Sequence, residues 1–296
     1  MNVQCPLDRG PLGGSGSSLR CGSCGSTYAV VEGVPLLISE DLSAQHVHQR
    51  AYFDAEFSEF ETYRVDNWRE SFNDRMFPAL GIAPGCPSYL DVGVGGSGAT
   101  VIEAARVGAD AVGCDLSVEG VVSAARFAES EGVASRTTFV VCAAEHLPFA
   151  DGSFGAASAV ALLEHLDDDD LAVAELSRVL RPGGRLWVTV PHAYKHMPPF
   201  AWLPYWLHDR HIGHKRHYDD TRLRALMERH GLRHVDTQFT GHPVKLLQYS
   251  LVLIASRFDR HMSKLWWKLE RADLRAVRRP FWALQLSGVF EKPSSG

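Results

Sequence analysis

A glycine-rich turn and two acidic residues are the side chains of this sequence best suited to chemistry. The turn reads Asp91-Val-Gly-Val-Gly-Gly-Ser-Gly98 and overlaps the end of the run Tyr89 to Val92, and Asp115 lies twenty residues after Gly95. Glycines let the backbone turn sharply and approach a ligand closely, and a carboxylate after the second strand can accept both hydroxyl groups of a ribose. The spacing therefore predicts a site for an adenosine-containing cofactor.

The same turn also fits a second kind of cofactor. Gly93, Gly95 and Gly98 match the G-x-G-x-x-G pattern of dinucleotide-binding proteins. Asp91 argues against a dinucleotide, because its carboxylate would face the negative charge of a pyrophosphate, whereas it suits the ammonium group of a bound amino acid. A nicotinamide-dependent oxidoreductase is therefore the second interpretation.

Strands and helices alternate from residue 88 onward, and these elements must position the turn. Strands are expected at 89–92, 111–114, 137–142, 156–161, 185–190, 235–239 and 282–290, and helices at 99–107, 117–130, 171–180 and 221–230. The alternation predicts an α/β fold, doubly wound around a mostly parallel, seven-stranded sheet over residues 88–296. Ligands of such sheets bind beyond the carboxyl ends of the strands, which is where the glycine-rich turn falls.

Five stretches of this region resemble the class I S-adenosylmethionine-dependent methyltransferases, in the group similar to the ubiquinone and menaquinone methyltransferases. They are LDVGVGGSG (90–98), VGCDLS (112–117), AEHLPFADGSF (144–154), ALLEHL (161–166) and ELSRVLRPGGRLWVTVP (175–191). The resemblance implies a Rossmann-like fold with an antiparallel last strand, S-adenosylmethionine as cofactor, and methyl transfer as the activity.

The resemblance also implies which residues bind the cofactor. Asp91 would stand near the methionine ammonium and Asp115 would bind the ribose. The other implied contacts are Gly93, Gly95 and the neighbouring Gly96 along the methionine portion, Leu116 on the adenine, Ala144 and Glu145 at the adenine edge, and Ala161 and Leu162 under the methionine.

Three positions depart from the family pattern. The glycine-rich turn is one residue longer than usual, Ala143 stands where an acidic residue usually receives the adenine amine, and Gly155 stands where an acidic residue is common. These departures motivate a third interpretation, a non-catalytic protein that binds the cofactor and acts through a partner.

Residues 1–40 differ in composition from the rest and form a small β-rich module. Cys5-Pro-Leu-Asp8 and Cys21-Gly-Ser-Cys24 are knuckle-like turns separated by twelve residues, and a tetrahedral zinc ion takes four ligands from two such turns. Residues 5–38 resemble the Trm112-like zinc-ribbon module. We expect Cys5, Asp8, Cys21 and Cys24 to be the ligands of a structural zinc; a ribbon that folds without metal is the alternative.

Residues 191–219 form an expected substrate loop, which carries six of the fourteen histidines. A hydroxyl acceptor benefits from a nearby base, and the candidates are His165, His214 and His192, with a structural hydrogen bond as the alternative for each. We expect irregular backbone here, which does not favour a histidine metal site. The stretch GHKRHY (213–218) resembles a segment of methyltransferases found near polysaccharide and glycolipid biosynthesis enzymes.

The acceptor predicted from that stretch is a hydroxyl of a sugar, glycan or glycolipid intermediate. A small aromatic or polyketide-like natural product is the second choice. Residues 41–87 are expected to form a helical cap or linker, and residues 241–280 a helical insertion. The basic and apolar residues of the insertion suit a membrane surface or a lipid-linked substrate, and equally a solvated face or a homodimer contact.

Composition narrows the class further. The net charge of −5 argues against a nucleic-acid partner bound by bulk charge. Six cysteines in 296 residues are too few for a disulfide framework. The first residues show no basic region followed by an apolar run, so we expect no secretory signal. A cytoplasmic protein with reduced thiols is the resulting prediction.

Overall fold

The structure is a computed structural model. It describes residues 3–14, 16–38, 43–58, 63, 67–86, 88–197, 199–241 and 278–294, with backbone only at 67–71, 201, 204 and 208. The expected insertion at 241–280 therefore lies almost wholly outside the described residues.

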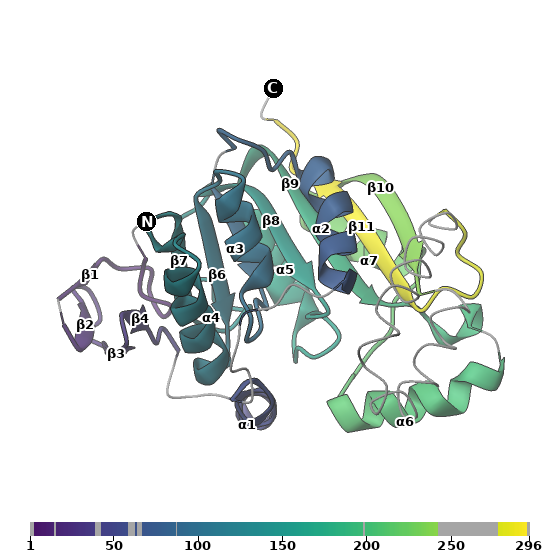
Figure 1. Cartoon of the computed structure of the whole chain (residues 1–296), viewed down its shortest axis with the longest axis horizontal. Coiled ribbons are helices and arrows are strands. Elements are labelled where there is room, and N and C mark those ends of the chain that lie inside the picture. The colour runs from purple at the N-terminus through teal and green to yellow at the C-terminus, as the bar shows by residue number, and fades with distance from the viewer. Residues whose placement is uncertain are drawn as a thin grey trace.

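A seven-stranded sheet in the order β10-β11-β9-β8-β5-β6-β7 lies at the centre of the chain (Figure 1). Every neighbouring pair is parallel except those of β11, which runs antiparallel to both β9 and β10. The fold class predicted from the sequence is confirmed. The strands are β5 (Tyr89–Val92), β6 (Ala111–Asp115), β7 (Thr137–Val141), β8 (Phe154–Val160), β9 (Leu180–Pro191), β10 (Arg233–Thr240) and β11 (Gln285–Glu291).

Helices cover both faces of this sheet (Figure 1). On one face lie α2 (Asn67–Leu80), α3 (Ala99–Arg106) and α4 (Val118–Ser130), and on the other α5 (Asp169–Val179) and α7 (Asp220–Arg229). Side-chain caps set their starts: Ser117 accepts a hydrogen bond from the backbone N–H of Gly120, 3.0 Å, and Asp168 and Asp219 cap α5 and α7 in the same way. The apolar strands are buried between the two helix layers.

The sequence order of the strands reverses between β5 and β8. From β5 the chain continues to β6 and β7 on one side, whereas β8 and β9 lie on the other. This arrangement opens a crevice beyond the carboxyl ends of β5 and β8. Helix α1 (Ala44–Phe57) lies across that end of the sheet (Figure 1).

The N-terminal module is a four-stranded antiparallel sheet of β1 (Leu12–Gly13), β2 (Ser18–Cys21), β3 (Thr27–Val31) and β4 (Val34–Pro35). It lies beside β7 and α4 (Figure 1). Leu36 pairs with Val141 at the end of β7, and the Leu37 N–H donates to the Val141 carbonyl, 2.7 Å. The short sheet is thus joined to the edge of the large one.

The expectation of irregular backbone at 191–219 is wrong. Two short 3-10 turns, Tyr194–His196 and Pro199–Ala201, lead into helix α6 (Trp202–Ile212). Pro199 lies before α6 and Pro204 lies in its first turn, where a missing N–H costs nothing. None of the described helices is long and apolar enough to cross a membrane.

Candidate functional site

A cavity of about 240 Å³ lies at the carboxyl ends of β5, β6 and β8, beneath α1. Nine of the ten predicted cofactor residues line it: Gly93, Gly95, Gly96, Asp115, Leu116, Ala144, Glu145, Ala161 and Leu162. Residues from four separate stretches of the sequence therefore meet in one place, as the motif order predicted.

The glycine-rich turn packs directly under an aromatic residue of α1. Gly93 and Gly95 adopt positive φ angles of 81° and 63°, a region that other residues rarely occupy. A Cβ at Gly96 would lie 2.8 Å from the Cβ of Phe57, and one at Gly120 would lie 2.6 Å from Cδ2 of the same ring. A side chain at Gly96 would collide with Phe57, so the packing of α1 on the turn requires glycine at this position.

Helix α1 contributes a wall of the cavity with His46, Gln49, Arg50, Phe53 and Phe57. The rings of Phe53 and Phe57 stack with centroids 5.5 Å apart, and Phe53 also meets the ring of His165 edge-on at 5.5 Å. The aromatic row therefore extends from the glycine-rich turn to the opposite end of the cavity. The segment 41–87, expected to form a helical cap or linker, thus includes a helix whose aromatic side chains line the cavity.

Asp115 at the end of β6 holds the turn in place. Its carboxylate accepts hydrogen bonds from the backbone N–H groups of Gly95 and Ser117, each 3.0 Å. Burial raises the pKa of Asp115, and these hydrogen bonds oppose the shift. Each oxygen keeps a second lone pair for a ligand hydroxyl.

Asp91 is the one predicted cofactor residue that does not line the cavity. It is buried in β5, where the Ser158 hydroxyl of β8 donates to it. Glu145, by contrast, lies in the cavity wall, is 3% exposed and accepts a hydrogen bond from His46 of α1, 3.2 Å, through Oε1. Its Oε2 has no hydrogen-bond partner among the described residues.

Only one of the three candidate bases reaches the cavity. His165 lines it, and burial lowers the pKa of this imidazole to about 3, with the neighbouring His214 contributing. His165 is therefore neutral at physiological pH, and its Nδ1 has no partner among the described residues. Such a ring is a weak base that can still form a hydrogen bond to a bound acceptor.

His214 and His192 lie elsewhere. The ring of His214 is 4.8 Å from that of His165, outside the cavity wall, and its Nδ1 lies 2.7 Å from Asp209 Oδ1. His192 is 1% exposed, bonds through Nδ1 to the Ala283 carbonyl, 3.1 Å, and stacks on His196. Burial lowers the pKa of His192 to about 4, with the charge of His196 adding to the shift. For His192 the contacts fit the structural alternative.

The GHKRHY stretch is engaged internally. Lys215 and Arg216 pair with Asp167 and Asp169 after β8, and Tyr218 donates its hydroxyl to Asp169 Oδ2, 2.7 Å. His217 Nε2 lies 2.9 Å from Asp209 Oδ2. The stretch whose resemblance suggested a sugar acceptor therefore has its charged side chains paired with carboxylates of the same chain.

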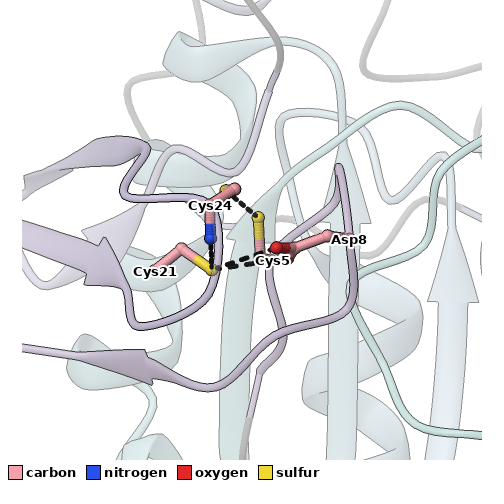
Figure 2. Close-up of side chains that lie close together, drawn as sticks. All are labelled: Cys5, Asp8, Cys21 and Cys24. Carbon is pink, nitrogen blue, oxygen red and sulfur yellow. Dashed lines mark hydrogen bonds between the residues drawn. The ribbon is translucent and has the colours of Figure 1, made fainter.

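The four predicted metal ligands lie together at one end of the N-terminal module (Figure 2). The Sγ atoms of Cys5 and Cys24 are 3.7 Å apart, and Cys21 Sγ lies 3.3 Å from Asp8 Oδ1. Two sulfurs each bound at about 2.3 Å to a tetrahedral ion would be about 3.8 Å apart. The donor set and its spacing fit Zn²⁺. The group lies away from the cofactor cavity, because none of the four residues lines it.

A glycine-rich turn, a carboxylate after the second strand and a crevice at the sheet reversal together define a doubly wound domain suited to an adenosine-containing cofactor.

Comparison with known proteins shows which family this region resembles. Residues 90–188 match the family described as "Methyltransferase domain". The chain is 35% identical over 117 residues to the methyltransferase GfsG of Streptomyces halstedii, covering 40% of this chain and 42% of that protein. It is 30% identical over 146 residues to the O-methyltransferase rstn1 of Aspergillus nomiae, covering 49% and 63%.

Demethylmenaquinone methyltransferases also match, in line with the predicted group. Among solved structures, the geranyl diphosphate C-methyltransferase of Streptomyces coelicolor A3(2), in complex with S-adenosyl-L-homocysteine, superposes with a TM-score of 0.62 at 15% identity, covering 84% of this chain and 98% of that one. The chain spans about half the length of the curated relatives it matches. The match to a methyltransferase domain thus covers residues 90–188, and the solved structures share the doubly wound fold.

Proposed function

We propose that this chain transfers a methyl group from S-adenosylmethionine to a hydroxyl of a small organic molecule. The observation that carries the proposal is the meeting of nine predicted cofactor residues in one cavity under α1. Asp115 would accept the ribose hydroxyls. Glu145 Oε2, buried and without a partner among the described residues, would receive the adenine amine in place of the acidic residue that the family has where this chain has Ala143.

The chemistry asks little of the protein beyond alignment. The acceptor oxygen attacks the methyl carbon in line, the carbon–sulfur bond breaks, and S-adenosylhomocysteine leaves as a neutral thioether. The acceptor proton passes to solvent or to a nearby group. His165, neutral and at the cavity wall, is placed to orient the hydroxyl.

A natural-product hydroxyl is the acceptor favoured over a sugar. The support for a sugar was GHKRHY, whose charged side chains pair within the chain. The relatives named above include an O-methyltransferase. The aromatic row of Phe53 and Phe57 gives the cavity an apolar wall that suits an aromatic or polyketide-like molecule. Membrane contact, a homodimer and a cytoplasmic location stay predictions.

Calorimetric titration with S-adenosylhomocysteine, run beside NADH, tests the cofactor. We expect binding of the first alone. Asp115→Asn should weaken it by about 1–3 kcal/mol, or roughly 5- to 150-fold, because a charged acceptor is lost. Asp110→Asn is the matched control, since that carboxylate is exposed and, among the described residues, pairs with Arg136 on the surface. Equal affinity in the Asp115 variant and wild type would refute the ribose placement. Acceptor screening should then include phenols, polyketides and sugars in parallel.

We further propose that Cys5, Asp8, Cys21 and Cys24 hold a structural zinc ion. The support is the 3.7 Å sulfur spacing and the convergence of all four side chains (Figure 2). In protein purified without added metal, wild type should contain about one zinc ion per chain more than a triple Cys→Ser variant. Equal zinc in both proteins would exclude this site.

A further inference from the structure

A second group of potential metal ligands lies against the cofactor cavity. Glu164 and His165 follow β8, and His214 follows α6, so two distant segments supply them. One ligand atom from each of the three lies within 4.8 Å of the others. Glu164 is 1% exposed, His165 is 9% exposed, and the His214 side chain is 8% exposed.

Two of the three residues, Glu164 and His165, each have a buried polar atom that finds no partner among the described residues. These atoms are Glu164 Oε2 and His165 Nδ1. His214 Nε2 lies 3.8 Å from Glu164 Oε1, too far for a hydrogen bond. Two atoms each about 2.1 Å from one ion lie roughly 3–4 Å apart, so this spacing is that of two ligands sharing an ion.

Asp209 of α6 holds His214 in the matching orientation. Its Oδ1 lies 2.7 Å from His214 Nδ1, which turns Nε2 toward Glu164. The other carboxylate oxygen contacts His217 and receives the Tyr194 hydroxyl. A carboxylate behind a ligand histidine is the usual outer partner in metal sites, where it sets the tautomer and the ring direction. Asp209 is therefore a positioning residue here.

We propose that Glu164, His165 and His214 bind one divalent transition-metal ion at the acceptor end of the cavity. Two imidazoles and one carboxylate favour a borderline ion such as Zn²⁺ or Co²⁺ over Mg²⁺. Three protein ligands leave coordination positions open, and His165 lines the cavity. On the basis of the proposed function, the acceptor would be a molecule that offers an oxygen to the ion beside its methylated hydroxyl, such as a catechol or a hydroxy-ketone.

Cobalt titration followed by absorption tests this site in the full chain. Cobalt bound by cysteine gives intense thiolate charge-transfer bands in the near ultraviolet, whereas an ion held by nitrogen and oxygen gives only weak visible bands. The two proposed sites are therefore separable in one spectrum. Glu164→Gln removes the charge with little change of shape. His234→Asn is the matched control, because that histidine bonds to Thr237 on β10 and lies against Phe290, away from the proposed ligands.

Besides any cobalt held by the cysteines, we expect wild type and His234→Asn to bind one cobalt ion that adds no thiolate bands, and Glu164→Gln to bind that ion at least about tenfold more weakly. Only thiolate-bound cobalt in wild type, or undiminished sulfur-free binding in Glu164→Gln, would overturn the proposal. Titration of the same samples with S-adenosylhomocysteine shows that each variant is folded. It also separates the two proposals: cofactor binding without the sulfur-free ion rejects the metal site alone, and the ion without cofactor binding rejects the proposed function alone.

Discussion

The packing of α1 can be tested at the contact between Phe57 and Gly120. The effect of Gly120→Ala on stability should change from destabilising to neutral or stabilising when the Phe57 ring is removed. Gly120 lies in the first turn of α4, where alanine would ordinarily favour the helix by about 1 kcal/mol. A Cβ there would lie 2.6 Å from Phe57 Cδ2 and 3.1 Å from Ser117 Oγ. Carbon atoms in contact prefer about 3.5–4.0 Å, so Gly120→Ala must displace the ring, and α1 with it.

Overpacking of this size costs about 1–3 kcal/mol. After the helix gain, Gly120→Ala should lower the free energy of unfolding by up to about 2 kcal/mol. The affinity for S-adenosylhomocysteine should fall with it, because α1 forms one wall of the cavity. In a Phe57→Ala background the ring atoms are gone, and the same change should be neutral or stabilising. The expected coupling energy between the two positions is about 1–3 kcal/mol.

Urea unfolding and calorimetric titration of wild type, Gly120→Ala, Phe57→Ala and the double variant measure the coupling energy. Gly132→Ala is unsuitable as a control because its φ is positive, whereas Gly13→Ala meets nothing within 4 Å. If Gly120→Ala has the same effect with and without the Phe57 ring, the described seat of α1 on the glycine-rich turn is incorrect.

Three further predictions follow from contacts around the site. The hydrogen bond with Glu145 raises the folded pKa of His46 above 6.5. The stability lost in His46→Gln should therefore be full below that pH and vanish as pH rises through the folded value, measured by urea unfolding at about pH 6 and about pH 9; an effect that grows with pH would contradict this. Arg178 donates a two-pronged pair of 2.7 Å bonds to Glu175, so Arg178→Ala should cost about 3–5 kcal/mol in the same assay, and a loss below about 1 kcal/mol would count against the pairing. Gly10→Ala should weaken zinc retention against a chelator, since its Cβ would lie 2.8 Å from Cys21 Sγ, whereas Gly13→Ala should not.

Much of the sheet could be predicted because residues that mark the ends of its strands lie next to those strands in the sequence. The apolar runs that became β5 and β6 are followed by the glycine-rich turn and by the capping residue Ser117, and these two boundaries follow from backbone chemistry. The convergence of the predicted cofactor residues has the same origin: a parallel sheet brings its carboxyl ends together, so the positions after each strand must meet.

The parts that could not be predicted depend on long-range packing. Nothing near Gly96 in the sequence shows that Phe57 lies on it. Helix α6 lies in the segment that was expected to have irregular backbone, and its large apolar residues, such as Trp206 and Leu207, are exposed and mark no buried face. Asp209 and Glu164 became neighbours of His214 only through that helix. The burial of His192 likewise depends on distant contacts, because Ala283 and Leu284, just before β11, accept hydrogen bonds from its ring and its backbone N–H.

The bridge between Leu36 and Val141 has a consequence for how the chain is made. A ribosome delivers the N-terminal module first, while the edge strand that receives it comes roughly a hundred residues later. At synthesis rates of about 5–20 residues per second, the module waits roughly 5–20 seconds for its partner. During that interval Tyr28 and Leu37, buried in the finished protein, lack their final covering. Because the N-terminal module is synthesised before β7, it must keep its fold until that strand is available to pair with it.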